Sequence, residues 1–135
     1  MKTLIITLAF ISLVGCQTLS QQATGGGGTQ LQTRQLQTKN VEDITKTQAL
    51  RASIATLQDL EFVIDKADFV LGSVTATKLT YGIIKITVIV RKTKRGVTIR
   101  ANARQGKNPL ADPLVYQNFF TALDKSIFLV KNKIN

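Results

Sequence analysis

Basic side chains are the residues of this chain whose spacing best suits chemistry, and that chemistry is the binding of anions. The 135-residue chain has a formal net charge of +10, and residues 78 to 107 contain neither Asp nor Glu. A concentrated positive field of this kind attracts anionic partners. The candidate partner-binding residues are therefore Lys85, Arg91, Lys92, Lys94, Arg95, Arg100 and Arg104.

Three interpretations of this basic segment are open. The side chains can simply keep an exposed sheet soluble and protect its edge, they can bind an anionic protein or envelope component, or they can bind nucleic acid. The last is disfavoured, because bases stack on exposed aromatic side chains and Tyr81 is the only aromatic residue between Lys78 and Lys107.

Catalysis has little support in the sequence. The chain has no histidine and a single cysteine, which excludes Ser-His-Asp and Cys-His catalysis and leaves no CxxC metal or redox site. Asp65 and Asp68 lie three residues apart and could form a carboxylate pair, but side-chain hydrogen bonds in a turn explain both. The sequence predicts a non-enzymatic protein with no metal and no dissociable cofactor.

The single cysteine, Cys16, predicts a lipid anchor. Lys2, the apolar residues 4–13 and the small residues that follow have the order of a secretory signal, and the polar residues from Gln17 onward make the run too short to span a bilayer. The sequence Leu-Val-Gly-Cys ending at Cys16 resembles the bacterial lipobox. This resemblance implies cleavage before Cys16, a diacylglycerol on its sulfur and an acyl chain such as palmitate on its amino group. An ordinary secreted protein and a retained membrane anchor remain alternatives.

The resemblance also implies a location. In enteric-type bacterial lipoproteins, a residue other than Asp after the acylated cysteine implies sorting to the outer membrane, and here that residue is Gln17. We therefore expect the protein on the periplasmic face of the outer membrane, held by its acyl chains.

The chain divides into three parts. Residues 1–15 are the expected lipoprotein signal peptide, and residues 16–30 are the acylated cysteine and a Gly-rich tether, whose composition is typical of a flexible coil. Residues 31–135 are long enough for one periplasmic domain with one core. With no second cysteine, packing alone must stabilise this domain.

An antiparallel hairpin is the clearest expected element. Apolar residues alternate with polar ones from Ile84 to Val90 and again from Val97 to Ala103, and the short loop between the two runs contains Gly96. Such alternation indicates two paired strands with one buried face. It places four candidate residues on the exposed face (Lys85, Arg91, Arg100 and Arg104) and the other three in the loop.

The remaining pattern predicts a weak edge strand at 31–38, a helix from an Asn40 cap to about Leu60, and strands at 62–64 and 73–79 separated by a turn at 65–68. A final helix follows an Asp112 cap and Pro113. The expected fold class is α+β: a two-layer sandwich with an antiparallel sheet of four or five strands, covered on one face by two helices.

One segment resembles a known family. Residues 49–65, with Asp68 and Gly72-Ser73-Val74, are similar to the repeated domains of BamC-type lipoproteins of the outer-membrane barrel-assembly machine. The similarity covers about 30 residues of a single domain, where BamC-type proteins have two. It implies a helix-grip-like fold and a non-enzymatic role in a complex. The expected function is an interaction subunit that docks an anionic partner; the alternative is a binding module for an anionic polymer or lipid such as peptidoglycan.

Overall fold

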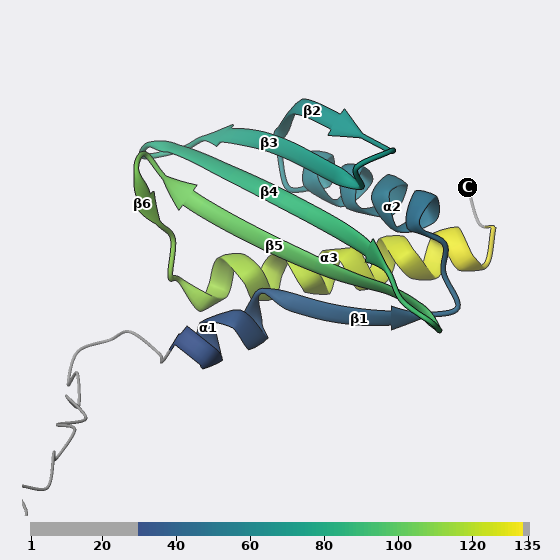
Figure 1. The fold of residues 1–135 in the computed structure, drawn as a ribbon. Coiled ribbons are helices and arrows are strands. Elements are labelled where there is room, and N and C mark those ends of the chain that lie inside the picture. The colour runs from purple at the N-terminus through teal and green to yellow at the C-terminus, as the bar shows by residue number, and fades with distance from the viewer. Residues whose placement is uncertain (1–29, 134–135) are drawn as a thin grey trace, which may run out of the picture.

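The computed structural model describes residues 30–133. The expected signal peptide, Cys16 and nearly all of the expected tether lie outside these residues. Nine elements follow one another along the described chain (Figure 1): α1 (Gln30–Leu36), β1 (Thr38–Glu42), α2 (Lys46–Asp59), β2 (Val63–Asp68), β3 (Ser73–Leu79), β4 (Ile83–Lys92), β5 (Gly96–Gln105), β6 (Asn108–Pro109) and α3 (Pro113–Lys131).

The strands form one open antiparallel sheet in the order β1-β5-β4-β3-β2, with the two-residue β6 also paired to β5. β1 and β6 lie against different parts of the same edge of β5, and between them the backbone N–H of Ala101 donates to the carbonyl of Gln37 at 2.9 Å. The expectation of an α+β protein with an antiparallel sheet is confirmed, and the described part of the chain contains three helices rather than two.

The core lies between the sheet and the helices α2 and α3, which run along one side of it (Figure 1). The inward side chains of β4 and β5 are buried as their alternation predicts, and α3 buries Tyr116, Phe119, Leu123 and Ile127. Each large apolar side chain that is fully buried stabilises the fold by about 1.5–3 kcal/mol. The opposite face of the sheet is left for other interactions.

The hairpin, the third strand and the last helix agree with the sequence analysis. β3 spans Ser73–Leu79 as expected, and β4 and β5 pair so that Val88 lies opposite Ala101. Asp112 caps α3, where its carboxylate accepts from the backbone N–H of Leu114 at 2.9 Å, and Pro113 occupies the first turn.

The expected Asn40 cap is wrong, and α2 begins later. Thr45 is the N-cap: its hydroxyl accepts from the backbone N–H of Gln48, and the Gln48 side chain accepts from the backbone N–H of Thr45. This reciprocal capping box satisfies two free donors at once. Asn40 lies instead in β1, where its side-chain oxygen accepts a 2.6 Å hydrogen bond from the Thr98 hydroxyl.

Two further local expectations are wrong. Residues 31–38 are mostly the helix α1, in keeping with the helix propensity of Gln, Leu and Arg, and the edge strand starts only at Thr38. The expected turn at 65–68 is still strand, with a bulge between Ile64 and Lys66. The chain turns at 69–72, where Gly72 has φ +76° and a Cβ would meet the carbonyl oxygen of Val90 at 2.5 Å.

Candidate docking surface

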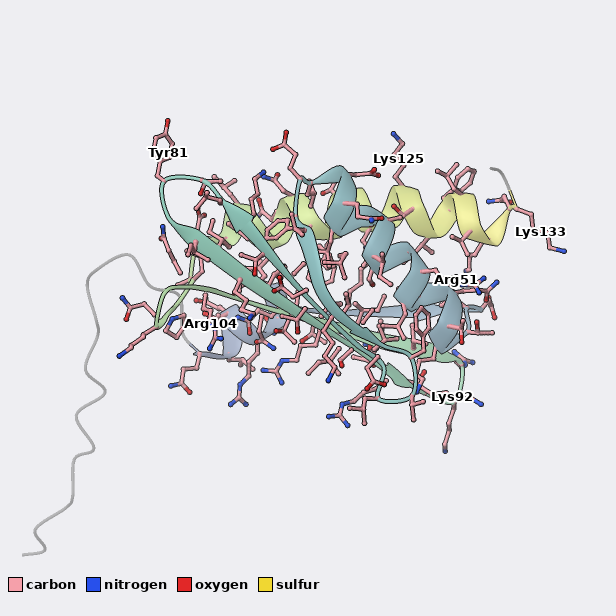
Figure 2. The ribbon with its side chains drawn as sticks, turned by 90° about the horizontal axis from the view of Figure 1, so that it is seen from above. Arg51, Tyr81, Lys92, Arg104, Lys125 and Lys133 are labelled. Atoms are coloured by element: carbon pink, nitrogen blue, oxygen red, sulfur yellow. The ribbon has the colours of Figure 1, made fainter. Side chains whose placement is uncertain are left out.

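The face of the sheet that points away from the helices carries the candidate basic residues of β4 and β5. We call it the open face, and define it by the outward side chains of these two strands. Figure 2 shows Arg104 on the side of the sheet away from α3. The register sets Lys85 opposite Arg104, Ile89 opposite Arg100 and Arg91 opposite Thr98. The open face consists of Ile83, Lys85, Thr87, Ile89, Arg91, Thr98, Arg100, Asn102 and Arg104.

Two of the seven candidate residues are partly neutralised within the domain. The ammonium of Lys85 lies 3.7 Å from a carboxylate oxygen of Asp65, and Arg95 lies 3.5 Å from the carboxylate of Glu42. Asp65 also accepts from the Thr77 hydroxyl at 2.7 Å. Within residues 30–133, no such ion pair is made by Arg91, Lys92, Lys94, Arg100 or Arg104.

The pairing of Lys85 with Arg104 sets two cations directly across from each other. Opposite residues of antiparallel strands have their Cβ atoms about 5 Å apart, and like charges at such positions destabilise the sheet. The Asp65 carboxylate offsets this repulsion only from the Lys85 side. An anion over this pair would offset the remaining repulsion.

Two adjoining hollows shape the open face, and Asn102 lines both. The smaller, of about 270 Å³, lies between Arg91 and Arg100 and is bordered by Thr38 from β1. The larger, of about 490 Å³, is lined by cations (Lys85, Arg104 and Lys107) and by hydrogen-bonding groups (Gln37, Thr87 and Asn102). Together they provide charged and neutral polar groups along one continuous surface.

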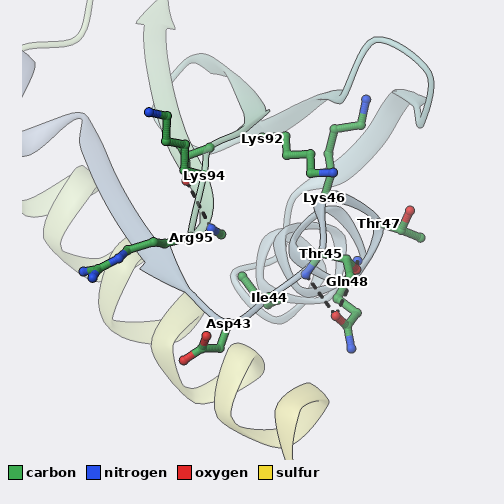
Figure 3. A pocket seen from close by; sticks show the side chains of 11 residues that line it. Asp43, Ile44, Thr45, Lys46, Thr47, Gln48, Lys92, Lys94 and Arg95 are labelled. Atoms are coloured by element: carbon green, nitrogen blue, oxygen red, sulfur yellow. Dashed lines mark hydrogen bonds between the residues drawn. The ribbon is translucent and has the colours of Figure 1, made fainter.

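The other three candidate residues lie at one end of the sheet: Lys92 is the last residue of β4, and Lys94 and Arg95 are in the loop that follows, so the expected placement of Lys92 in the loop is wrong. A hollow of about 420 Å³ separates this loop from the start of α2, and its lining includes Lys46, Lys92, Lys94 and Arg95 (Figure 3). The ammonium of Lys46 donates to the carbonyl of Val70 at 2.8 Å. The end of β4 and this loop therefore form a second basic region.

The sequence analysis missed residues that border these basic regions. The turn between β2 and β3 exposes Phe69, Val70 and Leu71 beside Lys46, and their run directly before Gly72 is the signal that could have indicated an apolar turn. Thr38 and Gln37 contribute to the hollows only because β1 pairs with β5. Nothing in the sequence around Gln37 and Thr38 indicates that they line these hollows.

The two aspartates considered for catalysis have separate partners. Asp65 binds Thr77 and Lys85, whereas Asp68 accepts from the backbone N–H of Leu71 at 2.8 Å and so stabilises the turn. Among residues 30–133 there is no group of three His, Cys, Asp or Glu side chains suited to a metal ion. The helices described for this chain also include none with the length and apolar character needed to cross a membrane.

Comparison of the chain with protein-family models and with curated protein sequences gave no match.

Proposed function

We propose that this chain is a non-enzymatic lipoprotein of the bacterial envelope that docks an acidic partner protein on its open face and on the basic loop at 92–95. Acyl chains on Cys16 hold it at the periplasmic face of the outer membrane. The domain is a helix-grip-like two-layer sandwich whose helical layer leaves the open face available. The partner is a subunit of an envelope complex.

The observation that carries this proposal is the set of unneutralised arginines on the open face. Arg91, Arg100 and Arg104 are exposed and form no ion pair among the described residues. Arginine presents a planar fork of donors that matches a carboxylate in two parallel hydrogen bonds, and it is enriched in protein interfaces. Three such groups on one rigid sheet suit an acidic protein surface.

The apolar turn at 69–71 supports a protein partner further. Protein interfaces combine an apolar centre with a polar, charged rim. Val70 and Leu71 are exposed next to Lys46, which shares a hollow with the basic loop. A partner segment with acidic and apolar residues matches this combination.

The experiment is crosslinking in cells, followed by pull-down of the tagged full chain and mass spectrometry. The test variant is Arg100→Glu/Arg104→Glu. The matched control is Lys125→Glu/Lys131→Glu, which changes the net charge equally but on exposed positions of α3. We expect one envelope protein to be recovered with the wild type and the control and lost with the test variant. Equal recovery with both variants contradicts docking on the open face.

An anionic envelope polymer such as peptidoglycan is the second candidate. It is favoured by the larger hollow, where Gln37, Thr87 and Asn102 offer hydrogen bonds to sugar groups beside three cations. Binding of the full chain to purified cell-wall sacculi, weakening steeply with salt and lost with Arg100→Glu/Arg104→Glu, would select this candidate. The lipid anchor has its own test, since Cys16→Ala should abolish incorporation of labelled palmitate.

A further inference from the structure

The end of the sheet opposite the basic loop carries an exposed apolar tip. This end, which we call the Tyr81 end, consists of the β3–β4 loop at 80–82, its flanking residues Leu79 and Ile83, and the β5–β6 turn. Leu79 is 79% exposed, Tyr81 is fully exposed and Ile83 is 58% exposed. Leu79 and Ile83 are direct partners across the two strands. Three large apolar side chains are thus exposed at the tip of one hairpin.

Basic side chains lie beside this apolar tip. The backbone N–H of Gly106 approaches the carbonyl of Ile83 at 3.4 Å, so the turn that holds Lys107 lies against the hairpin. Arg104 and Lys85 follow along the open face and share a hollow with Lys107. An apolar tip with a basic border matches the boundary between the acyl chains and the anionic headgroups of a bilayer, where tyrosine is enriched.

The described chain also begins at this end. In Figure 1, α1 lies on the same side of the molecule as the β3–β4 loop, and the basic β4–β5 loop lies at the other side. Thirteen residues separate Cys16 from Gln30, and the fourteen steps along the chain between the two can span at most about 50 Å. An anchor at Cys16 therefore limits the first turn of α1 to within about 50 Å of the bilayer.

We infer that the Tyr81 end rests on the bilayer that holds the anchor, with Leu79, Tyr81 and Ile83 in its interfacial region and Lys107 at its anionic headgroups. This inference rests on the proposed lipid anchor. Its consequence is orientation: the ten residues of β4 extend about 30 Å, so the basic loop at 92–95 points away from the membrane and toward a partner.

The experiment uses the purified, acylated full chain in vesicles of phosphatidylethanolamine and phosphatidylglycerol, with and without brominated acyl chains. The chain has no tryptophan, so Tyr81→Trp supplies a single fluorescent reporter. Val70→Trp is the matched control, because Val70 is 87% exposed in an apolar turn away from the Tyr81 end. Both side chains are exposed, so both variants should fold.

We expect brominated lipid to quench the emission of Trp at position 81 severalfold and to leave Trp at position 70 unchanged. In the Tyr81→Trp background, Leu79→Asp/Ile83→Asp should remove the quenching. Suppose that mass spectrometry shows the chain to be acylated. Quenching at position 70, or at neither position, then overturns the inference about the Tyr81 end but does not contradict the lipid anchor. A chain that carries no acyl group overturns the anchor, and the inference with it.

Discussion

The two ends of β4 are both tight antiparallel turns, yet their chemistry is opposite. Where β4 begins, the loop Thr80-Tyr81-Gly82 has no charged residue and is flanked by exposed Leu79 and Ile83. Where β4 ends, Lys92 and the loop residues Lys94 and Arg95 are all basic. Loop tips contribute little to the core, so packing constrains their composition less than that of the strand between them.

This difference shows that one strand joins two regions of unlike chemistry, an apolar loop and a basic one. The strand between the ends is governed by packing: Ile86, Val88 and Val90 are all buried. The side chains at the two ends are exposed and are free of that constraint. In the proposed orientation the membrane is at the apolar end, and the partner docks on the open face and the basic end.

The largest effect is expected when the core that joins the two ends is damaged. Phe119 is 1% exposed and makes an edge-to-face contact with Phe120, their ring centroids 5.1 Å apart. Phe119→Ala should lower the free energy of unfolding by about 3–5 kcal/mol through the lost burial and the cavity left behind. Urea unfolding measures this loss.

The same experiment can break the comparison. Trp at position 81 and Trp at position 70 should report the same urea midpoint, because a small single domain unfolds cooperatively. Phe119→Ala should lower this midpoint equally for both reporters. Two separate midpoints would show that the ends belong to independent units.

A smaller and local effect is expected for Gly96→Ala at the basic end. A Cβ at this position would lie 2.1 Å from the carbonyl oxygen of Val41, so β1 would have to move away from β5. Such overpacking costs about 1–3 kcal/mol. Amide hydrogen exchange should become faster in β1 and at the start of β5.

Gly106→Ala at the Tyr81 end is the control for this change. Nothing lies within 4 Å of a Cβ there, but φ is +59°, so only backbone strain of about 1–2 kcal/mol is expected. In Gly106→Ala, amide hydrogen exchange should become faster only in the β5–β6 turn. If Gly96→Ala accelerates exchange equally at both ends, the close approach of β1 to β5 is not the cause.

The smallest effect is expected from relieving the like-charged pair on the open face. Arg104→Thr removes one of two cations that face each other across β4 and β5 and should raise the free energy of unfolding by about 0.2–1 kcal/mol. Thermal unfolding at low salt measures the gain, which should shrink at high salt. A loss of stability would mean that Arg104 has a structural rather than a binding role.

Elements with a strong local pattern could be predicted from the sequence. The alternation in β4 and β5 is regular enough to assign both strands and their buried face, and Asp112-Pro113 identifies the start of α3 because both residues suit a helix N-terminus. The positions of Lys85, Arg91, Arg100 and Arg104 on one face follow from the same alternation.

Elements whose neighbours are distant in sequence could not be predicted. Asn40 is a good helix cap in isolation, but β1 pairs with β5 so that Asn40 lies opposite Thr98. Residues 65–68 have the composition of a turn, yet they continue β2 along the edge of β3. In both places tertiary pairing outweighed the local preference.

The sequence by itself determined the excess of positive charge, its concentration between residues 78 and 107, and the alternation that assigns each strand residue to one face. These follow from residue types and from the two-residue period of a strand. The tertiary structure alone decided which cations are neutralised, because Asp65 reaches Lys85 and Glu42 reaches Arg95 only through strand pairing. It also decided that the turn with Lys107 lies beside the apolar loop, since the backbone N–H of Gly106 meets the carbonyl of Ile83 only in the assembled sheet.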